Sequence, residues 1–305
     1  MMAVLYSVAV SLAYSLSCFG LGWVVAVPLT RWRRKLLFGS DAVFKLSYLA
    51  SVFLVGTAAY AALLIVLGIL GMLDRLVIVV ILVPGFAAFL LSAVRRGDPW
   101  PRLAAALASV RSQPRWSGLI FALIIAVSLG FAVAAWFTPP RGDAAAFYLV
   151  YPKIVAAAGT LIPMPGGYES FSMIGLSSEL HFAALLVLAD VGAAKLFMFP
   201  VALACAALLA GLVRASGGGF VAVVLGCAAL LTSNAFHLYV FDGKVDLHAT
   251  AFALASLYWL FLRPVPEAGY GPYLVSGAFA GLATVAKFSY IPALGASLLV
   301  LLLWR

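Results

Sequence analysis

The chain has 305 residues, of which 66% are hydrophobic and only 10% are charged. Soluble domains are about half apolar and about one quarter charged, so this composition excludes an ordinary soluble protein and indicates an integral membrane protein. The formal net charge of +9 would suggest a nucleic-acid partner in a soluble chain. In a membrane protein, basic residues instead indicate which loops face the cytoplasm, and we expect no nucleic acid as a partner.

Several long apolar stretches predict the fold class. A helix needs about 20 apolar residues to cross a hydrocarbon core about 30 Å thick. The sequence therefore predicts an all-α, polytopic transmembrane bundle of about nine spans, with a long outer-face loop that contains short juxtamembrane helices. The predicted spans are residues 4–29, 46–72, 76–94, 117–137, 191–213, 219–240, 247–262, 271–286 and 288–304. The first lacks a basic segment and a convincing cleavage site, so we expect a retained helix and no removable signal peptide.

The basic residues predict the orientation of these spans. They concentrate in the stretch RWRRK (31–35) and in the loop 95–115. By the positive-inside rule both loops are cytoplasmic, which places the N-terminus and the loop 138–190 outside. Seven of the ten carboxylates then lie at or near the outer face: Asp74, Asp143, Glu169, Glu179, Asp190, Asp242 and Asp246.

The composition also predicts a domain organisation. Residues 1–96 form an apolar N-terminal bundle of three helices without recognisable chemistry. A cytoplasmic linker, 97–116, contains three prolines and several arginines and is the expected boundary. Residues 117–305 form a second membrane core.

The outer loop is too long for a simple connection, since long structureless loops are uncommon unless they are functional. Asp143 follows a glycine and precedes three alanines, which predicts a helix that starts with Asp143 as its N-cap. Pro152 is expected to kink or end that helix, and Gly159 to stop the short run that follows. Residues 171–189 are apolar but contain several polar groups, so we expect them to lie at the membrane interface or to re-enter.

Three charged residues are candidates for chemistry at this face. Asp143 suits an N-cap, and it also suits a general base that takes a proton from a hydroxyl; the two roles are compatible. Asp246 opens a predicted span, where ionisable residues are costly and often functional, and on a continuous helix it would share a face with Asp242. Lys287, in LATVAKFSYIPAL, is either a lysine that snorkels to the interface or a cation that binds a phosphate.

The other candidates carry weaker signals. Lys153 adds a cation to the outer loop, and Tyr148 is an interfacial anchor or a ring that stacks on a sugar. A divalent metal is a further alternative, but the histidines and acids lack the spacing of a zinc motif, so hydrogen-bonding roles are favoured and no cofactor is required. The residues that such a metal would use are Asp143, Glu169, Glu179, His181 and His248.

The order of these motifs resembles that of the GT-C superfamily of integral membrane glycosyltransferases. An acid follows a span in GDAAAFYLVYPKIVAAAGTLIPMP (142–165), a serine-rich stretch leads to Glu179, VDL (245–247) opens a span, and GLATVAKFSY (281–290) closes one. The similarity extends over about 117–305 and is greatest to protein mannosyltransferases and aminoarabinose transferases, in a bacterial branch with extra N-terminal helices.

This resemblance implies a function and a set of roles. Asp143 matches the acid that acts as general base on the acceptor, Lys287 the basic residue near the lipid phosphate, and Asp246 and Glu179 two further acids of the family. The donor would be a sugar on a polyprenyl phosphate, and the reaction an inverting transfer at the outer face of a bacterial inner membrane. Tyr148, Lys153 and His248 are added as candidates for the donor-phosphate or acceptor site.

Two alternatives belong to other classes. The first is a non-catalytic scaffold or subunit that binds lipid or a membrane protein partner. Proteins of this superfamily continue beyond the position of Arg305, and a shortened chain would favour this alternative. A secondary transporter is the second, but inverted repeats are not apparent and the charges gather at one face instead of the midplane.

Overall fold

The computed structural model describes residues 2–30, 42–96, 138–166, 176–261 and 270–303, with Glu169 and a few positions between 123 and 133. Every regular element in these ranges is helical, which confirms the all-α class. The predicted linker 97–116 and most of the predicted span 117–137 lie outside the described residues.

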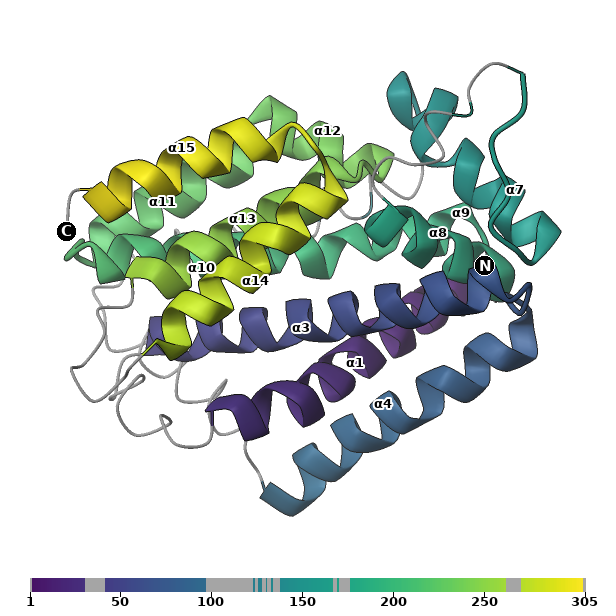
Figure 1. Ribbon diagram of the computed structural model, residues 1–305, viewed down its shortest axis with the longest axis horizontal. Helices are drawn as coiled ribbons and strands as arrows, with labels where there is room; N and C mark the ends of the chain where they lie inside the picture. Colours follow the sequence, from purple (N-terminus) through teal and green to yellow (C-terminus); the bar gives the residue numbers. More distant parts are fainter. Residues whose placement is uncertain are drawn as a thin grey trace.

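The first three helices pack tightly around glycines. They are α1 (Met2–Thr30), α3 (Ala42–Ile69) and α4 (Arg75–Arg96), and α1 contacts both of the others (Figure 1). A Cβ atom at Gly56 of α3 would lie 1.7 Å from the carbonyl oxygen of Cys18 in α1. The close approach of the two backbones therefore requires glycine there, as is common between membrane helices.

Four shorter elements gather at the end of the molecule that contains the N-terminus (Figure 1). They are the π-type turn η2 (Ala144–Tyr148), α7 (Val150–Ala158), α8 (Leu176–Leu188) and α9 (Val191–Leu196). Helix α8 is the described part of 171–189, for which an interfacial or re-entrant position is expected; it packs against α3, α7 and α9, and most of its side chains are buried. Its polar groups therefore face other helices.

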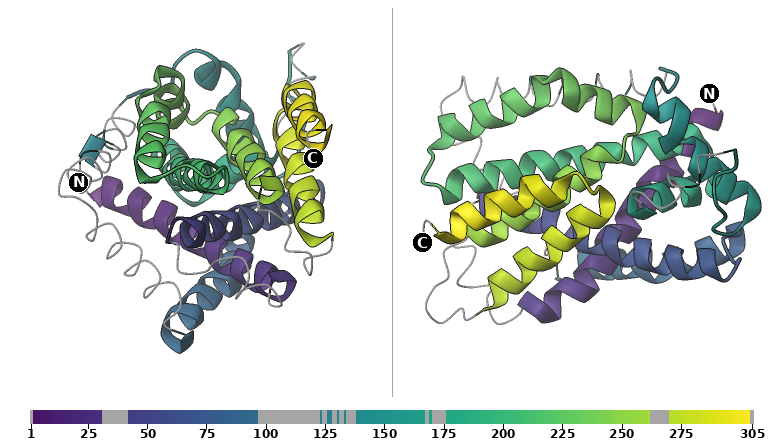
Figure 2. Two further views of the ribbon diagram at one scale, coloured as in Figure 1. Left: turned by 90° about the vertical axis from the view of Figure 1, so that its left-hand side faces the viewer. Right: turned by 45° about the horizontal axis from the view of Figure 1, so that its top comes forward.

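The rest of the chain completes the bundle with α10 (Met198–Ala215), α11 (Phe220–Thr232), α12 (Asn234–Asp242), α13 (Asp246–Phe261), α14 (Gly271–Ala286) and α15 (Tyr290–Leu303). Helix α10 packs against both α3 and α13, and α13 packs against α14. In the views of Figures 1 and 2, α3, α10 and α13 lie within one bundle. The first three helices thus share their core with the helices that follow residue 176.

Apolar length supports a membrane location for part of this bundle. Four helices in the described ranges are long and apolar enough to cross a membrane: Met2–Ala26, Val43–Ile69, Arg75–Val94 and Val191–Ala215. A fifth candidate, Phe220–Thr232 with Asn234–Val240, is bent by 63°. The continuous span predicted at 219–240 is therefore two helices, because the hydroxyl of Ser233 accepts the N–H of Phe236 and starts α12 anew.

A buried polar network connects four of the helices at Thr57, in the middle of α3. Nε2 of His181 lies 3.0 Å from the Thr57 carbonyl oxygen, and Nε2 of His248 lies 3.1 Å from the Thr57 hydroxyl. The Tyr14 hydroxyl lies 2.6 Å from Nδ1 of His181, and the Ser178 hydroxyl 2.8 Å from Nδ1 of His248. We call these five residues the Thr57 network; they come from α1, α3, α8 and α13.

The partners determine which nitrogen of each histidine carries the proton. A carbonyl oxygen can only accept, so His181 donates through Nε2 and its Nδ1 accepts from Tyr14. The Thr57 hydroxyl already donates to the carbonyl oxygen of Leu54 at 2.8 Å, so it accepts from Nε2 of His248, whose Nδ1 accepts from Ser178. In its neutral form each ring therefore has both nitrogens hydrogen-bonded.

Thr57→Val tests the contribution of this network to stability. The variant keeps the side-chain shape but leaves the Nε2–H of His248 without an acceptor, so we expect a loss of about 1–3 kcal/mol. The measurement is the thermal unfolding midpoint of the purified protein in a mild detergent. The matched control is Thr232→Val, which removes an exposed hydroxyl that bonds its own helix. Equal midpoints for the two variants would contradict the network.

Candidate functional site

A helical segment starts after Asp143 as predicted, but the predicted capping hydrogen bond of Asp143 is not formed. Asp143 is the residue before η2, but its side chain makes no capping hydrogen bond. Its carboxylate instead lies 3.5 Å from Nζ of Lys244 and is 62% exposed. The break in the helix falls at Leu149, and Pro152 sits in the first turn of α7, where a missing N–H has no cost. Gly159 ends α7 with a φ of 68°, as predicted.

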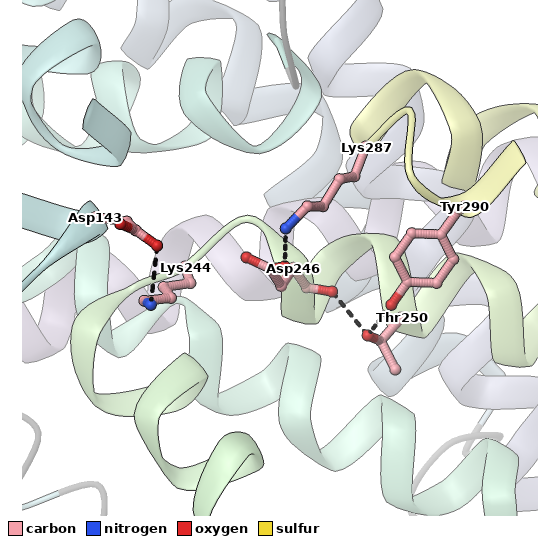
Figure 3. A network of polar contacts seen from close by, with 6 residues as sticks. All are labelled: Asp143, Lys244, Asp246, Thr250, Lys287 and Tyr290. Carbon is pink, nitrogen blue, oxygen red and sulfur yellow. Dashed lines mark hydrogen bonds and ion pairs between the residues drawn. The ribbon is translucent and has the colours of Figure 1, made fainter. Parts of the chain in front are cut away.

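The turn between α12 and α13 carries the next two charges. Gly243 ends α12 in the left-handed conformation, with a φ of 70°, and Asp246 is the first residue of α13. Asp242 and Asp246 therefore do not share one helix face, because the glycine separates them into two helices. The turn directs Lys244 toward Asp143 and Asp246 toward Lys287 (Figure 3).

The turn between α14 and α15 supplies the second cation. Lys287 follows the last residue of α14 in an extended conformation, and its ammonium donates a hydrogen bond to a carboxylate oxygen of Asp246. Burial alone would lower the pKa of Lys287, but the hydrogen bond and charge of Asp246 outweigh burial and raise the pKa. Lys287 is therefore held in its charged form.

Two hydroxyl groups stabilise the backbone beside this ion pair. The Thr250 hydroxyl donates to the carbonyl oxygen of Asp246 at 2.8 Å, one helical turn earlier. The Tyr290 hydroxyl lies 2.5 Å from the same Thr250 oxygen and must be the donor of that bond (Figure 3). The bond fixes the start of α15 against the first turn of α13.

Tyr148 of η2 lies within the electrostatic reach of these charges. Burial, followed by the negative charge of Asp246, raises the pKa of the Tyr148 phenol, and Lys287 acts in the opposite direction. The phenol is therefore neutral near pH 7 and can donate a hydrogen bond.

Together these side chains form one group, which we call the Asp246 cluster. It contains two carboxylates and two ammonium groups, so its formal charges balance. Its members come from three parts of the chain that are far apart in the sequence: Asp143, Tyr148, Lys244, Asp246, Thr250, Lys287 and Tyr290. Sequence reasoning did not select Lys244, Thr250 and Tyr290, although the spacing of Thr250 from Asp246 is that of one helical turn.

Three other predicted site residues lie elsewhere. His248 belongs to the Thr57 network, in the interior of the bundle. Lys153 is exposed on α7. Glu179 is only 3% exposed in α8, interacts electrostatically with Tyr151 of α7, and has one carboxyl oxygen, Oε2, without a hydrogen-bond partner.

Groups of possible metal ligands and similarity to known proteins are two further sources of information on the site. In the part of the chain that the structure describes, no group of three histidine, cysteine or acidic side chains is arranged to hold a metal ion. Comparison of the chain with protein-family models, curated proteins and solved structures found no match. The chemistry of the Asp246 cluster is therefore argued from its own residues.

The burial of Glu179 has a testable consequence for the pH dependence of stability. Burial raises the pKa of this carboxyl well above its usual range, which favours the protonated form. The folded chain then holds this proton at a pH where the unfolded chain releases it, so stability is full below about pH 4.3 and falls as the pH rises toward the folded value.

Glu179→Gln should remove this loss, because an amide has a similar shape and does not ionise. We expect the variant to unfold at a higher temperature than the wild type at pH 7, with the difference shrinking toward pH 4. Thr232→Val, which changes an exposed side chain that does not ionise, is the control and should show no such trend. A difference between the Glu179 variant and the wild type that stays constant from pH 4 to pH 7 would show that this carboxyl is not buried in its neutral form.

Proposed function

We propose that this protein transfers a sugar from a polyprenyl-phosphate donor to an acceptor, with inversion at the anomeric carbon, at the outer face of a bacterial inner membrane. The observation that supports this best is the convergence of Asp143, Tyr148, Asp246 and Lys287 in the Asp246 cluster. A lipid-borne donor needs a cation for its phosphate, and an acceptor hydroxyl needs a base. The cluster offers both beside apolar helices.

Asp143 is suited to the role of base. Its carboxylate is 62% exposed, so an acceptor can approach it from solvent. The acceptor oxygen forms a bond to the anomeric carbon while its proton passes to the Asp143 carboxylate. The bond from the anomeric carbon to the phosphate oxygen breaks, and polyprenyl phosphate leaves with the electron pair. Lys244, 3.5 Å away, compensates the charge of Asp143 before the proton arrives.

Lys287 is suited to the donor phosphate. Its ammonium stays charged because Asp246 raises its pKa, and a compact ammonium can bind a phosphate as a point charge. Asp246 also restrains the flexible lysine stem before the donor arrives. The arriving phosphate would then share the ammonium with Asp246 before and during transfer, so the lysine contributes mainly to donor binding.

The proposed orientation puts the end with the Asp246 cluster outside. Four acids, Asp74, Asp143, Asp190 and Asp246, lie toward this end, and Ser7 near the N-terminus donates a hydrogen bond to Asp190. Lys45, in the first turns of α3, lies toward the opposite end. About nine spans, an N-terminal three-helix segment at 1–96 that packs onto the later helices, and an outer loop at 138–190 belong to this proposal. The supply of the donor from the membrane lipid also belongs to it.

Asp143→Asn should reduce transfer by about 100-fold or more, because general-base catalysis contributes about 10²–10⁴ in rate. The assay uses the purified protein in vesicles, with labelled sugars on a panel of polyprenyl phosphates. Asp74→Asn is the matched control, since Asp74 accepts the N–H of Val77 at the start of α4 and asparagine caps helices equally well. Retained transfer in the Asp143 variant would remove its role as base.

The same assay separates the enzyme from a non-catalytic subunit. Absence of transfer by the wild type from every donor would contradict the proposed activity as a whole. If transfer occurs, Lys287→Met should raise the KM for the donor more than it lowers kcat, and an unchanged donor KM would remove the phosphate role of Lys287.

A further inference from the structure

A second polar feature lies beside the Asp246 cluster. A surface pocket of about 270 Å³ opens between the segment that precedes η2 and the first turn of α9. It is lined by Thr138, Pro139, Pro140, Asp190, Val191, Gly192 and Lys195. The smallest site that holds one water has about 10–15 Å³ on this measure, so the pocket has room for a ligand much larger than a water molecule, such as a single sugar ring.

The lysine of this pocket is held in a fixed position. Lys195 is 2% exposed, and its ammonium donates a hydrogen bond to the carbonyl oxygen of Thr138. Asp242 interacts with it electrostatically. An ammonium has three N–H donors, so further donors remain for a ligand in the pocket.

The pocket adjoins the Asp246 cluster through the turn at Gly243. The stem of Lys195 packs against this glycine, because a Cβ atom there would lie 3.4 Å from Cγ of Lys195. The next residue, Lys244, forms the ion pair with Asp143. On the other side, Thr138 and Asp143 are five residues apart in one segment. Two short segments, the turn at Gly243 and residues 138–143, therefore connect the pocket to the proposed base.

The charges of the pocket select against an anion. The lining contains one carboxylate, Asp190, and one ammonium, Lys195, which also interacts with the charge of Asp242, so the lining itself has no excess positive charge for a phosphate or carboxylate. Asp190 accepts the N–H of Ala193 at 2.9 Å and the hydroxyl of Ser7 at 2.7 Å, one bond on each oxygen. Each oxygen keeps a lone pair that can accept a hydroxyl proton.

The remaining wall is apolar and rigid. Pro139 and Pro140 have fixed φ angles and no N–H groups, so they present C–H surface without unsatisfied donors. A sugar ring has C–H groups on its face and hydroxyl groups on its edge. Its face would pack on the two prolines, and its hydroxyl groups would reach Asp190 and Lys195.

We propose that this pocket binds one uncharged sugar ring of the acceptor, with hydroxyl groups that donate to Asp190 and accept from Lys195. The proposal extends the proposed function to its acceptor and rests on that function for the direction of transfer. The binding itself is a separate property, because it does not require the donor.

Saturation-transfer NMR with the purified protein in lipid nanodiscs tests the binding. The probes are the methyl glycosides of glucose, mannose and N-acetylglucosamine, with methyl phosphate as the anionic probe. We expect at least one glycoside to bind and methyl phosphate to give no signal. Lys195→Met and Asp190→Asn should each weaken the glycoside by about tenfold, as expected for the loss of one hydrogen bond to a charged group.

Two controls keep the result interpretable. Lys45→Met removes a lysine of α3 far from the pocket and should bind the glycoside normally. Asp190→Asn retains a side chain that can cap α9, so unchanged unfolding midpoints would show that lost binding is not lost folding.

The possible outcomes test the pocket proposal independently of the proposed transfer activity. Failure of every glycoside to bind, or binding that both pocket variants retain, overturns the pocket whether or not the protein transfers sugar. Binding of methyl phosphate in place of glycosides also overturns it. Glycoside binding that both pocket variants weaken supports the pocket even if the transfer assay fails.

Discussion

The arrangement of the helices depends on one buried residue, Thr57. Its carbonyl and hydroxyl oxygens accept hydrogen bonds from His181 and His248, two histidines that lie on different helices. An unpaired polar group in an apolar interior costs several times the net gain of a typical hydrogen bond, so these bonds disfavour any sliding of α8 or α13 along α3. The first helices are therefore part of the same body as the rest of the described chain.

The hydrogen bonds to Thr57 also fix the position of the candidate site. His248 lies two residues after Asp246, so the bond that holds His248 also fixes the first turn of α13. Asp246 in turn holds Lys287, and Thr250 with Tyr290 fixes the neighbouring backbone. Balanced charges at the edge of an apolar bundle are less costly than isolated ones, which explains why two acids and two lysines occur together there.

Sequence patterns predicted those parts of the structure that have local causes. Apolar length located most of the helices, and Gly159 and Asp246 mark a helix end and a helix start as expected. The bend at Ser233 was not predicted, because the two helices together are long and apolar enough to pass for one continuous span. Of the predicted site residues, Asp143, Tyr148, Asp246 and Lys287 converge. His248 and Glu179 lie inside the bundle, because their positions depend on contacts between helices that no local pattern reveals.

The most direct test of this account is a cross-linking measurement between the segment before η2 and the turn that follows α12. Asp143→Cys is combined with Lys244→Cys in a chain whose three native cysteines are replaced by alanine, and a short bifunctional thiol reagent is applied in the membrane. Efficient cross-linking of this pair, without cross-linking of Lys45→Cys to Lys244→Cys, is the predicted result. Cysteines at 143 and 244 that both react with a monofunctional maleimide but do not cross-link would contradict the assembly of the site.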